Sequence, residues 1–237
     1  MARASEGPGF PPPWTGKVGE EGRGGRYDRL PIGVLLSGQG TNLEAILTRC
    51  EASQLDAEVR VVLSNRPNAP GLEYGRRHGI PTYAVPRSEY PSRDAQQAIM
   101  KQHLIHHGAE LVVLAGFDQI LSADFVETFS YRLVNLHPSL LPAFGGGMHA
   151  IRDALDYGAK VTGCTVHFVA SDFPEADSGP VISQESVPIF EDDDEQTLLS
   201  RVHAVEHRLL PDAIQLLAEG RVRLEGRRVR VLQPTSA

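Results

Sequence analysis

The stretch "PIGVLLSGQGTNLEAIL", residues 31–47, joins an apolar run to an amphipathic segment through a turn with two glycines. The apolar run is typical of a buried strand, and the spacing of the apolar residues after the turn predicts a helix. Gly38 and Gly40 let the backbone turn sharply between them. Thr41 and Glu44 have the spacing of a capping box at the start of that helix. This order of elements indicates one unit of a parallel α/β sheet.

The same alternation continues along the chain. Further apolar runs predict strands at 59–64, 82–85, 110–116 and 132–137, and helical periodicity fills the intervals. Two alternating runs, 162–170 and 179–189, then predict a hairpin-type addition. We therefore expect an α/β fold, a Rossmann-like open and mainly parallel sheet with helices on both faces.

The last part of the chain predicts a long helix and a small hairpin. Apolar spacing and an acidic start favour a helix over 194–217, which Pro211 is expected to kink or divide. Residues 220–233 resemble a terminal antiparallel hairpin. The whole of 31–237 is expected to form a single catalytic domain.

Composition limits the classes of function. The chain has 237 residues, 41% of them hydrophobic, and a net charge of -7, which argues against nucleic acid or an anionic membrane as a partner. Residues 1–30 are rich in Gly and Pro and predict a flexible tail without a signal peptide. Cys50 and Cys164 show no pairing pattern, which fits a reducing cytoplasm. No apolar run has membrane-spanning length.

The glycine turn is a candidate phosphate site. Backbone amides at the start of a helix bind anions, and the polar side chains of Thr41 and Asn42 beside Gly40 add hydrogen-bonding groups. A dinucleotide fingerprint would have a third glycine where Leu43 stands, and an ATP-binding P-loop would have a lysine in the turn. We therefore expect a monophosphate ligand; a capped turn without a ligand is the alternative.

A polar pair ends the predicted strand 132–137. Asn135 and His137 are two residues apart, so their side chains share one face at the carboxyl end, where open parallel sheets bind ligands. An amide and an imidazole together can donate to a carbonyl oxygen that gains negative charge during acyl transfer. Pro138 restricts the exit from the strand. A purely structural histidine is the alternative.

Acyl transfer to an amine also needs a group that moves a proton, and a carboxylate near the histidine would suit. The segment "ASDFPEADSGPVISQ" supplies Asp177, just before a Ser-Gly-Pro turn into the next strand. Asp172 and Glu175 compete with it for this role.

These residues lie in motifs that resemble the phosphoribosylglycinamide formyltransferases, the folate-dependent enzymes of purine synthesis. The resemblance covers residues 31 to about 231, in the family's order, and it is carried by "SGQGTNLEAI", "LVVLAGFDQIL", "LVNLHPSLLPAFGG", "GCTVHFV", "DSGPVISQ" and "VEHRLLP". It implies transfer of a formyl group from 10-formyltetrahydrofolate, a co-substrate, to the amine of glycinamide ribonucleotide.

The resemblance also implies roles for individual residues. The catalytic trio would be Asn135, His137 and Asp177. Gly40, Thr41, Asn42 and Glu206 would bind the ribonucleotide. The folate would be bound by Arg93, Phe117, Asp118, Gln119, Ile120 and Leu121.

Two departures from the family pattern affect the expected folate site. Family members commonly have Met-Arg where this chain has Asp118-Gln119, and the loop between Val169 and Asp177 is a few residues longer. The Ser-Gly-Pro sequence that follows Asp177 anchors the alignment.

Four other functions compete. Formyltetrahydrofolate deformylase uses a similar core, but its relatives usually carry an extra domain before it. Methionyl-tRNA formyltransferase needs a further RNA-binding domain after it. "HAVEH", residues 203–207, fits a zinc-protease pattern without an evident third ligand, so no metal is expected. A nucleotide-binding protein without catalysis would not require the trio.

Overall fold

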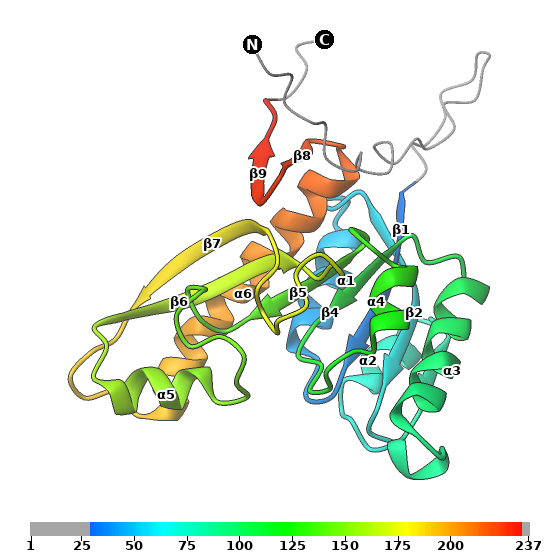
Figure 1. Ribbon diagram of the computed structural model, residues 1–237, viewed down its shortest axis with the longest axis horizontal. Coiled ribbons are helices and arrows are strands. Elements are labelled where there is room, and N and C mark those ends of the chain that lie inside the picture. Colours follow the sequence, from blue (N-terminus) through cyan, green and yellow to red (C-terminus); the bar gives the residue numbers. More distant parts are fainter. Residues whose placement is uncertain (1–28, 234–237) are drawn as a thin grey trace.

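The computed structural model describes residues 29–233 of the 237-residue chain. Within this range seven strands form one sheet in the order β3-β2-β1-β4-β5-β6-β7 (Figure 1). The first five strands pair in parallel, whereas β6 and β7 join them antiparallel. The strands are β1 (Leu30–Leu36), β2 (Ala57–Ser64), β3 (Thr82–Ala84), β4 (Leu111–Leu114), β5 (Leu133–His137), β6 (Val161–Phe168) and β7 (Val181–Pro188).

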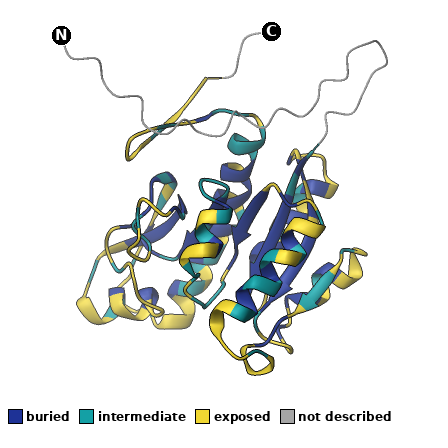
Figure 2. Cartoon of the chain, turned by 45° about the vertical axis from the view of Figure 1, so that its right-hand side comes forward, coloured by how far each residue is buried: buried dark blue, intermediate teal, exposed yellow. Residues whose placement is uncertain are grey.

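Helices cover both faces of the sheet, as the sequence predicts. The helices are α1 (Thr41–Glu51), α2 (Leu72–Arg77), α3 (Arg93–His106), α4 (Ala123–Thr128), α5 (Ala150–Tyr157) and α6 (Glu195–Ala218), with a 3-10 turn at Arg87–Glu89. Alternate residues of β1 face opposite sides: Val34 and Leu36 pack with α1 and α6, while Leu35 packs with α3 and α4. The strands are buried between these helices, which turn their polar faces outward (Figure 2).

The turn between β1 and α1 differs from the expected capping box. Gly40 is the N-cap of α1 with φ 76°, and no side chain caps the helix, so the prediction that Thr41 and Glu44 form a capping box is wrong. The turn lies against Gly71, whose Cα would be 2.5 Å from a Cβ on Gly40. Glycine is therefore required here both for the left-handed backbone and for this close approach.

Helix α6 is not divided at Pro211, where the sequence predicted a kink or a division. Asp194 caps it in a reciprocal capping box with Thr197, and the helix continues past Pro211 to Ala218. Pro211 is buried in the face that packs on the sheet. Burial of residues on both sides of Pro211 in the same core keeps the helix undivided, despite the backbone hydrogen bond that proline removes.

A separate antiparallel hairpin, β8 (Val222–Glu225) and β9 (Arg228–Val231), follows α6 and confirms the predicted terminal hairpin (Figure 1). At the other end Leu30 is the buried first residue of β1. The proposed tail, apart from its last two residues, lies outside the described residues. Among residues 29–233 no helix has the length and apolarity needed to cross a membrane.

Candidate functional site

The parallel strands β1, β2, β4 and β5 end at one edge of the sheet, where open α/β sheets bind their ligands. The glycine turn follows β1, and Asn135 and His137 lie at the end of β5. Only β4 separates β1 from β5, so the two groups lie about two strand spacings apart, roughly 10 Å. The fold therefore places the expected phosphate and catalytic groups along one edge.

Asn135 and His137 share a face of β5, as predicted. Val134 and Leu136 point to the core under α1 and α6, which leaves the two polar residues on the other side. His137 is buried and Asn135 is partly buried. Strand alternation alone therefore presents the amide and the imidazole together.

Asp177 returns from the loop between β6 and β7 and contacts both residues. Its Oδ1 accepts a hydrogen bond from Asn135 Nδ2 at 3.2 Å, and its Oδ2 lies 3.2 Å from His137 Nδ1. The backbone N–H of Gly146 also donates to Oδ2, at 2.9 Å. The structure thus brings together the three residues that the resemblance implies.

Asp172, one of the two competing carboxylates of this loop, accepts a hydrogen bond from the Tyr131 hydroxyl. The backbone carbonyl of Glu175, the other candidate, accepts from the Ser178 hydroxyl. Two residues after Asp177, Gly179 passes so close to β6 that a Cβ would lie 1.8 Å from the Phe168 carbonyl oxygen. This close passage explains a glycine at that position in the Ser-Gly-Pro turn.

His167 is a further member of the cluster; the sequence left open whether it lines the site or packs within its strand. It pairs with Asn135 across β5 and β6, and its Nε2 lies 3.2 Å from Asn135 Nδ2 and 3.5 Å from Asp177 Oδ1. Its Nδ1 donates to the Phe168 carbonyl oxygen at 3.0 Å. Only the strand register brings His167 opposite Asn135, and periodicity does not reveal register.

The surroundings of Asp177 favour the ionised carboxylate. Burial raises its pKa, but the contact with His167, the charge of His137 and the Gly146 N–H outweigh burial, so the pKa is lowered. Asp177 also has a left-handed backbone, with φ 56°. Such a conformation is unfavourable for most residues other than glycine and is often found at functional sites.

The second ring nitrogen of His137 faces the loop after β5. His137 Nε2 lies 3.0 Å from the carbonyl oxygen of Phe144, another residue with positive φ, 54°. A carbonyl oxygen can only accept, so Nε2 is the donor of this bond. With the Asp177 carboxylate 3.2 Å from Nδ1, both ring nitrogens of His137 face oxygen atoms of the protein.

The expected ribonucleotide residues meet where α1 packs on α6. Asn42 Nδ2 donates to Glu206 Oε2 at 3.0 Å, and both residues are buried. Burial raises the pKa of Glu206, although Asn42 and His207 partly oppose this. Among the described residues Asn42 Oδ1 has no hydrogen-bond partner. Gly40 and Thr41 precede this pair at the start of α1.

The pattern at 203–207 lies on α6, where its glutamate contacts Asn42. The rings of His203 and His207 stack 6.0 Å apart, and the Glu206 carboxylate is hydrogen-bonded to Asn42. In the part of the chain that the structure describes, no three His, Cys, Asp or Glu side chains are arranged to hold a metal ion.

The expected folate residues lie in the loop that follows β4 and on the neighbouring helix α3. Phe117 and Leu121 pack against the core, whereas Ile120 is 69% exposed. Gln97 of α3 bonds this loop through the Ile120 carbonyl oxygen. Arg93 is exposed one turn earlier on α3 and therefore shares a helix face with Gln97.

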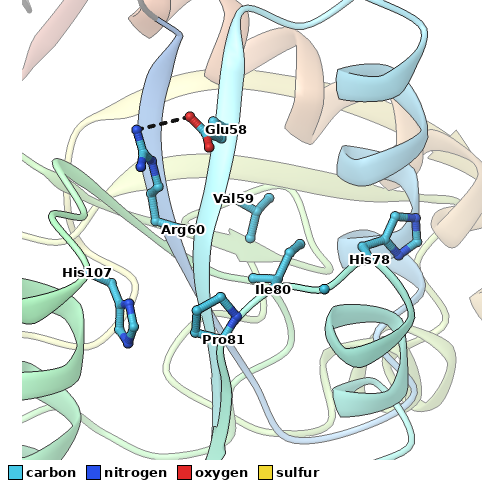
Figure 3. A pocket seen from close by; sticks show the side chains of 8 residues that line it. Glu58, Val59, Arg60, His78, Ile80, Pro81 and His107 are labelled. Carbon is cyan, nitrogen blue, oxygen red and sulfur yellow. Dashed lines mark ion pairs between the residues drawn. The ribbon is translucent and has the colours of Figure 1, made fainter.

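A pocket of about 310 Å³ lies at the start of β2 (Figure 3). Asn65 and the catalytic edge lie at the other end of that strand. Its polar side chains already have partners. Arg60 pairs with Glu58 at 3.1 Å, His78 contacts Glu51, and His107 Nε2 is 3.0 Å from the Tyr83 hydroxyl. We therefore assign the chemistry to the carboxyl edge and not to this pocket.

Comparison with known proteins identifies the family to which the chain belongs. A family model described as formyl transferase matches residues 31–214. The chain belongs to the formyl transferase family. The phosphoribosylglycinamide formyltransferase of Escherichia coli (strain K12) is 42% identical over 195 residues, which are 82% of this chain and 90% of that protein. The crystal structure of glycinamide ribonucleotide transformylase 1 from Symbiobacterium toebii has a TM-score of 0.85 and 45% identity, covering 90% of this chain and 99% of that one.

Other members of the formyl transferase family are longer or more distant. The trifunctional purine biosynthetic protein adenosine-3 of Gallus gallus is 42% identical over 197 residues, which are 83% of this chain but 19% of that protein. A formyltetrahydrofolate deformylase from Pseudomonas syringae pv. tomato has a TM-score of 0.79 at 27% identity, covering 86% of this chain and 66% of that one. This formyl transferase thus spans about a fifth of the chicken relative's length.

Replacing Glu206 by Gln is expected to raise the melting temperature more at pH 8 than at pH 5. The folded-state pKa of Glu206 is raised above the ordinary 4.5, so stability is lost as pH rises through the folded-state pKa. Gln cannot ionise, and its oxygen can still accept from Asn42. Thermal unfolding of both proteins at the two pH values measures the difference.

Glu219, which follows α6, supplies the matched control. Burial would raise its pKa, but Gln215 and Arg221 outweigh burial and the pKa is lowered. Glu219 therefore stabilises the fold above its unfolded-state pKa, and E219Q is expected to lower the melting temperature at pH 8. If E206Q raises the melting temperature by no more at pH 8 than at pH 5, Glu206 is not an ionisable group whose pKa is raised by burial.

Proposed function

We propose that this formyl transferase moves the formyl group of 10-formyltetrahydrofolate to the amine of glycinamide ribonucleotide, a step of purine synthesis. The observation that carries the proposal is the convergence of Asn135, His137 and Asp177 on the edge that also holds the glycine turn. The name and the 42% identity of the Escherichia coli relative support the same activity.

The ribonucleotide is proposed to extend from α1 to the end of β5. The first-turn amides of α1 would bind its phosphate, and Glu206 with Asn42 would bind the ribose hydroxyls. The unpaired Asn42 oxygen is suited to accept one of these hydroxyls. The roughly 10 Å between the two strand ends suits a sugar phosphate that carries a short amide arm.

In the proposed reaction the substrate amine attacks the formyl carbon, a new C–N bond forms, and the bond from that carbon to N10 of the folate breaks. The oxygen becomes an anion in the intermediate, and Asn135 and His137 would donate to it. Because His137 Nε2 already donates to the Phe144 carbonyl, the substrate oxygen would replace that acceptor. The Nε2–H of His137 would thus become available as a donor only when the substrate oxygen displaces the Phe144 carbonyl.

Asp177 would accept the proton that the amine loses and pass it, through water, to N10 of the departing tetrahydrofolate. A carboxylate with a lowered pKa is ionised at neutral pH and ready to accept. No enzyme nucleophile is needed. Burial raises the pKa of Cys50 to about 11 and of Cys164 to about 12, so neither thiol provides a thiolate.

The formyl donor would lie against residues 117–121 and the loop that carries Asp177. The exposed Ile120 offers an apolar surface to a folate ring, and the backbone groups of the loop offer hydrogen bonds. Arg93 provides a positive charge on the neighbouring helix α3, suited to an acidic folate tail.

Tetrahydrofolate release from the formyl donor is expected to depend on glycinamide ribonucleotide. The assay follows release with and without the ribonucleotide at equal protein concentration, and mass spectrometry follows formylation of the ribonucleotide. Equal release in its absence would contradict transfer and identify the protein as a deformylase.

His137→Ala is expected to lower kcat by about a hundredfold to a thousandfold, the loss typical for one oxyanion donor. Binding of the ribonucleotide, measured by calorimetry, should change little because its phosphate and ribose sites lie at the start of α1. Asp177→Asn should lower kcat while keeping the side-chain size and a residue that tolerates the left-handed backbone. An H137A enzyme with the wild-type rate would remove His137 from the mechanism.

A further inference from the structure

Three polar side chains form a closed ring of hydrogen bonds across the ends of β2, β1 and β4, which are neighbours in the sheet. Ser37 Oγ donates to Asn65 Oδ1 at 2.6 Å, and Asn65 Nδ2 donates to Asp118 Oδ1 at 2.7 Å. The backbone N–H of Asp118 completes the ring by donating to Ser37 Oγ at 3.0 Å. The ring ties the start of the 117–121 loop to two other strand ends.

Arg66 adds a charged contact to the ring. It forms an ion pair with Asp118 Oδ2, and the Asp118 side chain is 18% exposed. Burial raises the Asp118 pKa, but the contacts with Asn65 and Ser37 and the charge of Arg66 outweigh burial, so the pKa is lowered. Asp118 is therefore an ionised group directed into the ring, with both carboxylate oxygens occupied by protein donors.

The far end of the loop has a second attachment. Gln97 is 1% exposed; its Nε2 donates to the Ile120 carbonyl oxygen at 3.0 Å, and its Oε1 accepts from the Ser122 N–H at 2.7 Å. Asp118 and Gln97 thus fix both ends of a short loop whose central Ile120 side chain projects outward. A loop fixed in this way does not have to be ordered when a ligand binds.

We propose that Asp118 is a positioning residue for the formyl donor: it holds residues 117–121 so that Ile120 and the loop backbone are preorganised for the folate. The inference rests on the proposed function and extends it to a residue that departs from the family's usual Met-Arg. Asp118 acts through the Ser37–Asn65 ring and not by touching the donor, because both of its carboxylate oxygens are occupied within the protein.

Asp118→Ala is expected to raise KM for 10-formyltetrahydrofolate by about tenfold, the loss typical of one hydrogen bond to a charged group. KM for the ribonucleotide should remain within about twofold, since the Asn42–Glu206 pair lies on other elements. Asp118→Asn keeps an oxygen for Asn65 but loses the charge toward Arg66, and should give an intermediate KM. Equal donor KM values in wild type, D118A and D118N would overturn the proposal.

Two further variants separate positioning from general stability. Asp124, on α4, is an exposed aspartate that also pairs with a cation, Lys101, so D124A is the matched control and should leave both KM values unchanged. Asn65→Ala breaks the same ring at the end of β2 and should also raise KM for the donor. In the double variant with D118A, the rise in donor KM should be smaller than the two single effects combined. Full additivity, or an equal rise of both KM values, would show that the ring does not act as a unit on the donor.

Calorimetric titration with tetrahydrofolate distinguishes failure of this inference from failure of the proposed function. Binding to wild type but about tenfold weaker binding to D118A would support the positioning role even if no formyl transfer is observed. Ribonucleotide-dependent transfer with equal tetrahydrofolate affinity in both proteins would leave the proposed function intact and reject the role of Asp118. If D118A does not fold, the comparison of D118N with wild type decides in the same way.

Discussion

The carboxylate of Asp177 is the interaction on which the arrangement of the site depends. It contacts Asn135, His137, His167 and the Gly146 N–H, and so joins β5, β6 and two loops at one point. Buried polar groups are costly when they lose a partner, so removal of this one acceptor would leave several donors unsatisfied. The left-handed backbone of Asp177 and the close passage of Gly179 show that the loop is shaped to bring the carboxylate there.

The parallel sheet makes this local cluster part of a larger site. Because β1, β2, β4 and β5 end together, the Asn42–Glu206 pair, the Ser37–Asn65–Asp118 ring and the catalytic trio lie along a single edge. Each group uses polar contacts between segments that are distant in the sequence. Under the proposed function, separate regions of this edge would bind the sugar phosphate, the reacting atoms and the folate.

The sequence predicted those features of the site that depend on residues close together in the chain. Period-two alternation placed Asn135 beside His137, and the glycine turn marked the start of α1. Thr41 does not cap because Gly40 takes the N-cap position with a left-handed backbone, and α6 is undivided because residues on both sides of Pro211 share one core. His167 depends on strand register, and the Asp118 ring joins residues up to 81 positions apart, so neither can be inferred from spacing.

Nitrogen-15 NMR of the His137 ring at pH 7 tests the role of Asp177 most directly. The arrangement predicts that Nε2 donates to the Phe144 carbonyl, and that D177N changes the Nδ1 chemical shift because the Asp177 carboxylate lies 3.2 Å from Nδ1. The H137A spectrum assigns the signal. An Nδ1 chemical shift that is the same in wild type and D177N would contradict the account, because Asp177 would then not be the group that orients His137.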